Sequence, residues 1–308
     1  MPPRVLLIGA GGQLGWELRR TLLQCGEVIP TDRAKLDIAD EDAIRRVIRS
    51  QHPDIIVNAA AYTNVDKAET EPDLATKVNG IAPGIIAEEA HRAHSALVHY
   101  STDYVFSGSV TRPYSEEDEP NPVNLYGASK LAGEKAISAV DGAYLILRTS
   151  WVFGARGKNF LSTIIRMAQE QERLSVVDDQ ISVPTWSRAL AQATAEILHR
   201  VARRSTSIVN GIADRKGIYH VCCEDPTSRF DFAREMLEEY QRLNDAPQAL
   251  RTNLIPISSA EYRSHAKRPH FSVLSPRKIA DAFGVVIPSW REHLEAVLEE
   301  LRANWTSS

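Results

Sequence analysis

Tyr126 and Lys130 are the residues whose types and spacing most directly suggest chemistry. On a helix, side chains four residues apart lie on the same face, one turn from each other. A free tyrosine has a pKa of about 10, so proton transfer near neutral pH needs that pKa to fall by about 3, or roughly 4 kcal/mol. One ammonium about 4 Å away, at an effective dielectric constant of about 20, supplies about that much. We therefore expect Lys130 to lower the pKa of Tyr126, and Tyr126 to give and take a proton.

Thr102 is the third candidate catalytic residue. It ends the apolar run that begins at Ala96, and ligands of doubly wound sheets bind beyond the carboxyl ends of such strands. If a nicotinamide carries hydride to a carbonyl carbon, Thr102 holds the oxygen by a hydrogen bond and Tyr126 delivers the proton. The competing interpretation is a surface tyrosine–lysine pair on an amphipathic helix.

Gly9, Gly12 and Gly15 form a G-x-x-G-x-x-G pattern between an apolar run and a helical pattern. Glycine permits positive φ, a close approach of the backbone to a pyrophosphate, and tight packing of helix on strand. The free N–H groups at the helix start then face the anion. The pattern predicts a dinucleotide site, with a ligand-free strand–helix junction as the alternative.

Asp32 and Arg33 bear on which dinucleotide binds. Asp32 follows the second apolar run, where a carboxylate accepts hydrogen bonds from the adenosine ribose, which favours NADH. Arg33 suits the 2'-phosphate of NADPH, and Asp32 is then free to cap the turn before Asp37. Both cofactors stay open. Asp37 and Ile38 are expected on the adenine side, with strand packing as the alternative.

The elements that must position these residues alternate between strands and helices. Short apolar runs at residues 4–9, 28–31, 54–58, 96–101 and 144–149 read as strands, and residues 13–23, 41–49, 74–94 and 124–138 read as helices. This order predicts an α/β fold with a Rossmann-type doubly wound parallel sheet.

The chain past Trp151 is less regular. We expect helices at residues 160–169, 186–201, 228–242, 276–282 and 290–301. Residues 1–150 are thus predicted to form a dinucleotide-binding domain, and residues 151–308 a smaller α/β substrate-binding part. Whether the second part interleaves with the first stays open. Loops 178–185 and 262–274 are long enough to line a cleft, with solvated connectors as the alternative.

Composition excludes several classes of protein. The 308 residues carry a net charge of -4 and show no dense basic block, so a nucleic-acid partner is not expected. The longest stretch without a charged residue, from Val5 to Trp16, is too short to cross a bilayer. The first residues lack the features of an export signal, so we expect a cytoplasmic protein. Three cysteines without metal spacing are expected to be reduced.

Several stretches resemble the extended short-chain dehydrogenases/reductases, in particular members that act on dTDP-linked keto sugars. The glycine turn is shared across that family, whereas STDYVF and the D-Q-x-x-x-P-T pattern are more specific. The matching stretches are GAGGQLGWEL (9–18), VNAAAYTNVDKAE (57–69), HYSTDYVFSG (99–108), NLYGASKLAGEK (124–135), RTSWVFG (148–154), DDQISVPT (178–185) and KRPHFSVL (267–274). Residues 203–217 match only loosely.

The resemblance implies reduction, by NADPH or NADH, of the C4 ketone of dTDP-4-dehydro-L-rhamnose to dTDP-L-rhamnose, for cell-surface polysaccharide. It makes Thr102, Tyr126 and Lys130 the catalytic set, with Lys130 also bonding the nicotinamide ribose. The remaining implied contacts are Gly12, Gln13 and Leu14 with the pyrophosphate, Asp32 with the ribose, Ala61, Tyr62 and Thr63 with the nicotinamide half, and Thr102, Asp103 and Trp151 with the nucleotide sugar.

Two substrate contacts are also argued on physical grounds. The flat apolar face of Trp151 suits a sugar ring, although a core tryptophan is an alternative. Arg268 suits diphosphate oxygens, with a surface salt bridge as the alternative.

Other functions and partners stay open. A non-catalytic dinucleotide-binding subunit, similar to the regulatory subunit of methionine adenosyltransferase, is one alternative; the presence of Thr102, Tyr126 and Lys130 together argues against it. An epimerase, or a reductase of another nucleotide sugar, is a second. Some relatives form dimers through a magnesium site made of glutamates, and Glu17 lies in a matching stretch. We predict no metal site and leave a homodimer open.

Overall fold

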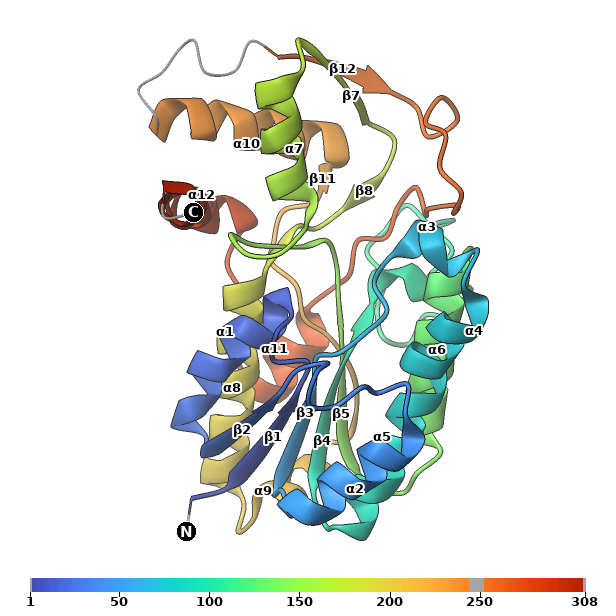
Figure 1. Ribbon diagram of the computed structural model, residues 1–308, viewed down its shortest axis with the longest axis vertical. Helices are drawn as coiled ribbons and strands as arrows, with labels where there is room; N and C mark the ends of the chain where they lie inside the picture. The colour runs from blue at the N-terminus through green and yellow to red at the C-terminus, as the bar shows by residue number, and fades with distance from the viewer. Residues whose placement is uncertain (1, 244–251, 307–308) are drawn as a thin grey trace.

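The computed structural model describes residues 2–243 and 252–306, and its centre is a parallel sheet of six strands (Figure 1). Its strands run in the order β10-β5-β4-β3-β1-β2, so the winding reverses at β1, between β2 and β3. Ligands of such sheets bind beyond the carboxyl ends of the strands at this reversal. The strand bounds are β1 (Arg4–Ile8), β2 (Glu27–Thr31), β3 (Ile55–Asn58), β4 (Ala96–Thr102), β5 (Ala143–Thr149) and β10 (Gly217–His220).

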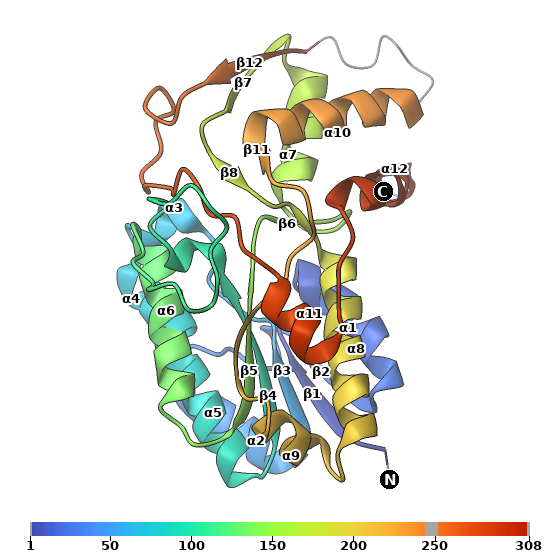
Figure 2. The ribbon, with the colours of Figure 1, turned by 180° about the vertical axis from the view of Figure 1, so that it is seen from behind.

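Helices cover both faces of the sheet (Figures 1 and 2). Successive strand residues point to opposite faces, so Val5 and Leu7 join one buried cluster while Leu6 and Ile8 join another. The doubly wound parallel sheet predicted from the sequence is therefore confirmed. One face carries α1 (Gln13–Thr21), α8 (Ser187–Arg204) and α11 (Arg277–Phe283), and the other carries α2 (Glu41–Gln51), α5 (Ala82–Arg92) and α6 (Leu125–Ser138).

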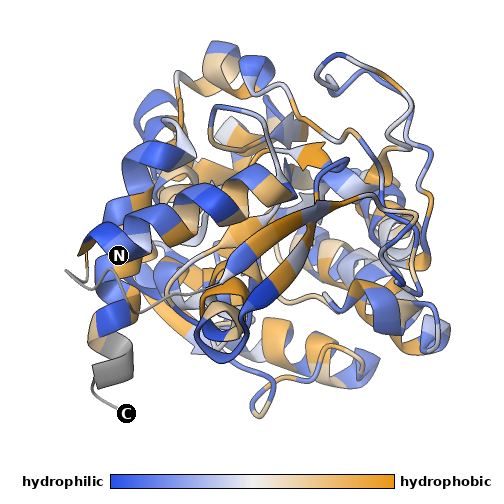
Figure 3. Ribbon diagram, turned by 90° about the horizontal axis from the view of Figure 1, so that it is seen from above, coloured by the Kyte–Doolittle hydropathy of each residue, from blue (hydrophilic) through white to orange (hydrophobic). Residues whose placement is uncertain are grey.

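A smaller group of elements lies beyond the carboxyl ends of the strands, at the top of Figure 1. Seen from above, the helices carry both hydrophilic and hydrophobic residues along their length, as amphipathic helices with one buried face do (Figure 3). Its helices are α7 (Phe160–Glu170), α10 (Arg229–Leu243) and α12 (Trp290–Thr306). Its short strands pair as β6 (Val152–Phe153) with β9 (Thr185–Trp186), β7 (Arg173–Val177) with β12 (Asn253–Ile257), and β8 (Ile181–Ser182) with β11 (Thr227–Ser228).

The five helices expected after residue 151 are all present, but the chain also returns to the central sheet. Strand β10 pairs in parallel with β5, and α8 packs against α1. Residues 203–217, which match the related sequences only loosely, include helix α9 (Ile208–Ala213), which Ser207 caps by accepting a hydrogen bond from the Asn210 N–H. Where the second unit begins stays a prediction. In the part of the chain that is described, none of the helices is suited to cross a bilayer.

The single helix expected at residues 74–94 is wrong in detail. The chain forms α4 (Pro72–Thr76), a π-helical turn (Lys77–Ile81) and then α5, after the short helix α3 (Val65–Ala68). Pro83 has no N–H, and in a regular helix its ring would clash with the carbonyl of Asn79. The wider turn moves that carbonyl against Gly133 of α6, where a Cβ would lie 2.1 Å from the oxygen. The glycine at position 133 therefore lets α6 approach the π-helical turn closely.

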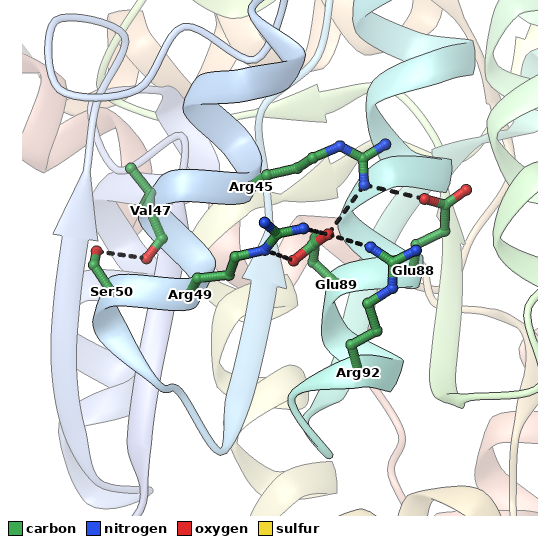
Figure 4. Close-up of polar contacts among 7 residues, drawn as sticks. All are labelled: Arg45, Val47, Arg49, Ser50, Glu88, Glu89 and Arg92. Carbon is green, nitrogen blue, oxygen red and sulfur yellow. Dashed lines mark hydrogen bonds and ion pairs between the residues drawn. The ribbon is translucent and has the colours of Figure 1, made fainter.

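Glu89 on α5 joins the two helices α2 and α5 (Figure 4). Its carboxylate, 2% exposed, accepts hydrogen bonds from Arg49 at 2.7 and 2.8 Å, from Arg45 at 3.0 Å and from Arg92 at 2.9 Å. Arg49, with Arg45 and Arg92, lowers the pKa of Glu89 to about 2, against the opposing effect of burial. The carboxylate is therefore charged at neutral pH.

We expect Glu89→Gln to lower the free energy of unfolding at pH 7 by roughly 1–2 kcal/mol, because solvent screens the exposed arginines. The pKa of Glu89 is depressed on folding, so its stabilisation is present above about pH 4.5 and is lost as the pH falls towards 2. Urea unfolding should therefore show wild type and variant converging below pH 4.5. Glu88→Gln is the control, since the half-exposed Glu88 contacts only Arg45 within this cluster. Equal losses in the two variants would contradict the assignment.

Candidate active site

A cavity of about 990 Å³ lies beyond the carboxyl ends of the central strands. It contains every residue predicted for catalysis or cofactor binding, and all but one of those predicted for the substrate. The structure thus brings together residues that the sequence spreads over more than a hundred positions; their individual roles stay predictions. The predicted residues that line it are Gly9, Gly12, Gln13, Leu14, Asp32, Arg33, Asp37, Ile38, Ala61, Tyr62, Thr63, Thr102, Asp103, Tyr126, Lys130 and Trp151.

The glycine turn fits a dinucleotide. Gly9 has φ 85°, and a Cβ there would lie 2.6 Å from the backbone nitrogen of Ala60. A Cβ on Gly15 would lie 2.0 Å from the Gly9 carbonyl oxygen, so helix α1 packs on the turn only with glycine. Gly12 is the N-cap of α1 and provides no side-chain cap. The first N–H groups of α1 therefore keep the capacity to bind a phosphate.

Asp32 and Asp37 line the cavity and also cap their own turns. An Asp32 carboxylate oxygen accepts a hydrogen bond from the Lys35 N–H at 3.1 Å, and Asp37 accepts one from Ala39 at 3.0 Å. The Arg33 side chain is 82% exposed and lies 3.7 Å from the Asp37 carboxylate. Asp32, which favours NADH, and Arg33, which favours NADPH, therefore lie at the same end of the cavity.

Asn79, on the π-helical turn, is a buried residue that the sequence analysis missed. Its side-chain oxygen accepts from the Tyr62 N–H at 2.9 Å, while its nitrogen donates to the Tyr62 carbonyl at 2.9 Å and to the Ser129 hydroxyl at 3.0 Å. Ser129 donates in turn to the Tyr126 carbonyl at 2.8 Å. This chain of bonds links the Ala61–Thr63 segment to the helix that carries Tyr126. The only signal for it in the sequence is Pro83, which causes the irregular turn.

Asp103 is a buried carboxyl group next to Thr102. It accepts hydrogen bonds from Ser272 at 2.5 Å, Ser182 at 3.2 Å and Thr102 at 3.1 Å. Burial raises the pKa of Asp103 to about 6, and these three hydroxyls oppose that rise. The two serines come from loops 178–185 and 262–274, so both loops reach the site.

The expected effect of Lys130 on Tyr126 is wrong in this structure. Burial raises the pKa of Tyr126 well above its usual value, with Thr102 acting in the opposite direction. The Lys130 amine is directed at β4 instead, where it donates to the Tyr100 carbonyl at 2.6 Å and lies 3.2 Å from the His99 ring. Burial lowers the pKa of Lys130 to about 8. Tyr126 is therefore a neutral phenol at physiological pH.

Trp151 lines the cavity with a strained backbone. Its φ of 39° is in the left-handed region, which a bulky residue rarely adopts. The guanidinium of Arg229, from α10, stacks 4.2 Å from the ring centre. Arg229 also donates to Gln180 at 2.9 Å and to the Tyr104 hydroxyl at 3.1 Å. Arg229 was not predicted, because nothing in the sequence around it indicates a contact with Trp151.

Arg268 is the one predicted substrate residue that does not line the cavity. Its guanidinium donates to both oxygens of Asp66, at 2.7 and 3.3 Å. The ion pair weighed as the alternative is thus present, and a contact with a diphosphate stays a prediction. The pair ties loop 262–274 to α3.

Glu17 does not fit a magnesium site in this chain. Its carboxylate accepts hydrogen bonds from the Arg188 guanidinium, which also donates to Glu300. A guanidinium between two carboxylates occupies the oxygens that a cation would need. In residues 2–243 and 252–306, no three potential metal-ligating side chains gather.

A family model described as the RmlD substrate binding domain matches residues 3–303. A dTDP-4-dehydrorhamnose reductase of Burkholderia thailandensis is 41% identical over 288 residues, 94% of this chain and 95% of that protein. One from Escherichia coli K12 is 39% identical over 302 residues, covering 96% and 97%.

Solved structures give the same result. The crystal structure of dTDP-4-dehydrorhamnose reductase from Bacillus anthracis in complex with NADP superposes with a TM-score of 0.85 at 36% identity. The match covers 97% of this chain and 100% of that one. The similarity therefore includes both the sheet and the smaller group of elements above it.

Proposed function

This chain belongs to the RmlD substrate-binding-domain family, and from that premise we propose that it reduces the C4 ketone of dTDP-4-dehydro-L-rhamnose to dTDP-L-rhamnose with NADPH. The observation that carries the proposal is that Thr102, Tyr126 and Lys130 line the same cavity as the glycine turn. The relatives named dTDP-4-dehydrorhamnose reductase support the substrate, and the NADP complex of one of them supports the cofactor.

The cavity suits a dinucleotide along its length. The glycine turn and the start of α1 bind the pyrophosphate, Asp32 and Arg33 the adenosine end, and the Ala61–Thr63 segment the nicotinamide half. When bound, NADPH supplies the hydride that reduces the ketone carbon.

The chain supplies the proton and orients the ketone. The Thr102 hydroxyl donates a hydrogen bond to the ketone oxygen, and Tyr126 transfers its phenolic proton to that oxygen. The raised pKa of Tyr126 keeps the phenol protonated at neutral pH, which is the form a reduction needs. Lys130 holds the nicotinamide ribose, and solvent restores the proton to Tyr126 after turnover.

The nucleotide sugar is proposed to bind at Thr102, Asp103 and Trp151, with the sugar ring against the indole. The guanidinium of Arg229 stacks on this indole, and its hydrogen bonds to Gln180 and Tyr104 fix the position of the guanidinium. A cytoplasmic location and a homodimer are further parts of the proposal; sedimentation of the purified protein tests the second.

The test is an assay of the purified protein with dTDP-4-dehydro-L-rhamnose and NADPH or NADH. We expect stoichiometric oxidation of the dinucleotide and a product identified by NMR as dTDP-L-rhamnose. An epimerase would interconvert sugars without net consumption of cofactor. A regulatory subunit would turn over no keto sugar and would co-purify with a synthetase. Either outcome would replace the proposal.

We expect Arg33→Ala to raise the KM for NADPH about tenfold, because the variant loses the hydrogen bond between the guanidinium and the 2'-phosphate. A charged hydrogen bond is worth roughly 1.5–3 kcal/mol, and exposure to solvent places this bond at the lower end of that range. The KM for NADH should stay within about twofold, since NADH has no 2'-phosphate. Lys35→Ala is the matched control: Lys35 is an exposed cation two residues away that does not line the cavity. Equal effects on the two cofactors would assign Arg33 no part in their discrimination.

A further inference from the structure

Three buried polar side chains lie in a line beside the cavity, on β3, β4 and α6. Asn58 is 3.1 Å from Nδ1 of His99, and Nε2 of the same ring is 3.2 Å from Nζ of Lys130. All three are almost fully buried. Asn58 and His99 do not line the cavity, so they act on it only through their neighbours.

The backbone fixes the direction of the first contact. The Asn58 side-chain oxygen accepts a hydrogen bond from the Ala60 N–H at 3.1 Å. The amide nitrogen therefore faces His99, and it donates to Nδ1. A neutral histidine whose Nδ1 accepts carries its proton on Nε2. Burial keeps the pKa of His99 well below its usual value, so the ring is neutral.

The second contact then brings an N–H group to Lys130. An ammonium has three donors and no lone pair, so it cannot accept a hydrogen bond from Nε2. A neutral amine can, and it still donates to the Tyr100 carbonyl at 2.6 Å. If Lys130 is an ammonium, the ring must move its proton to Nδ1, and Asn58 must turn its oxygen towards the ring. The Ala60 N–H would then face the amide nitrogen and lose its acceptor.

We propose that Asn58 and His99 are positioning residues that control whether Lys130 carries a proton, and that they link this proton to the backbone at Ala60. Ala60 directly precedes the Ala61–Thr63 segment, so the charge of Lys130 and the nicotinamide end of the cavity are coupled. The proposal rests on the proposed function only in the assumption that Lys130 takes part in the reaction.

The other ionisable groups around Lys130 do not account for this control. On α6, Glu134 lies one turn on and favours the charged amine, but it is paired with Arg148 of β5. Tyr126 lies one turn back on the same helix and is a neutral phenol. On β3 the facing group is the uncharged Asn58. None of the ion pairs found among the described residues includes Lys130, so His99 is the titratable side chain within hydrogen-bond distance of its amine.

The direct test is 15N NMR of the histidine rings in the wild-type protein, with the His99 signals identified by their loss in His99→Gln. Well above pH 8, where Lys130 is a neutral amine, we expect a protonated Nε2 and an unprotonated Nδ1, and well below pH 8 we expect the proton on Nδ1. A ring proton that stays on the same nitrogen across this pH range would overturn the proposal. This measurement needs no substrate, so it stays informative even if the protein reduces a different compound.

Asn58→Asp tests the link to Lys130. Both carboxylate oxygens accept, so one holds the Ala60 N–H and the other holds a proton on Nδ1, which leaves Nε2 free to accept from an ammonium. In the wild type, the affinity for NADPH, measured by the fluorescence of the dinucleotide, should weaken at alkaline pH. The midpoint of this change should lie near the pKa of Lys130. We expect the variant to shift this midpoint upwards by about one pH unit.

Asn58→Leu separates the hydrogen bond from the added charge. It releases His99 without introducing a carboxylate, and we expect a smaller upward shift of the same midpoint. A shift in Asn58→Asp alone would mean that charge, rather than the ring proton, acts on Lys130, and would overturn the proposal.

Discussion

Tyr126→Phe is expected to lower kcat by about 10²–10⁴-fold, the range for loss of a general acid. The phenylalanine ring fills the same space, so the KM values for NADPH and the nucleotide sugar should change by less than about threefold. The reason is chemical: the alkoxide that forms on the sugar has no other proton donor at the position of the Tyr126 hydroxyl. Steady-state kinetics with dTDP-4-dehydro-L-rhamnose measures both quantities.

Tyr104→Phe is the matched control for this variant. The two rings lie 5.9 Å apart in an edge-on arrangement, and Tyr104 accepts a hydrogen bond from Arg229. Loss of the Tyr104 hydroxyl should reduce kcat by less than about tenfold, the effect expected for the loss of a single hydrogen bond. Wild-type rates in Tyr126→Phe, or equal losses in both variants, would remove Tyr126 from the mechanism.

The largest expected effect on stability is that of Arg148→Met. Arg148 and Glu134 form an ion pair in which each side chain is 2% exposed, with bonds of 2.9 and 2.7 Å. Removing the guanidinium leaves a buried carboxylate without its charge partner, which costs about 3–5 kcal/mol. Since whole domains are stable by only about 5–15 kcal/mol, this is a large fraction of the total. Urea unfolding measures the change.

The double variant Arg148→Met/Glu134→Leu should recover most of that loss, because well-packed apolar residues replace a buried ion pair at little cost. Lys216→Met is the control for an exposed pair, since its partner Asp141 is almost fully exposed. A double variant no more stable than Arg148→Met would show that packing, rather than the unpaired charge, causes the loss.

Local patterns predicted most of the fold because each strand and helix has its own periodicity. The five strands of residues 1–150 and the five later helices are where apolar spacing indicated them. Two features depend on remote contacts and were not predicted. Strand β10 joins the sheet through β5, some seventy positions earlier in the chain. Helix α9 has only six residues, too few to show a helical period in the sequence, so its packing decides its structure.

The residues of the site likewise divide into those that local patterns predicted and those that depend on remote contacts. Residues in motifs next to strand ends were found, because the topology sends all those ends to one edge. Asn79 and Arg229 were missed, since each acts through a partner far away in the sequence. The spacing of Tyr126 and Lys130 correctly places them on one face of α6, but it says nothing of where the lysine amine points. The Tyr100 carbonyl and His99 attract it, and burial then dominates the pKa of the phenol.

The route of the chain between its two parts has a mechanical consequence. After β5 it leaves the sheet for α7 and β7, returns through α8 to β10, leaves again for α10, and returns through α11 before α12. Several segments of backbone thus connect the sheet to the smaller group of elements. Because more than one segment joins the two parts, the smaller group cannot rotate freely about a single linker. A fragment cut after residue 150 would lose those segments together with β10, and β5 would become a bare edge open to pairing with other chains.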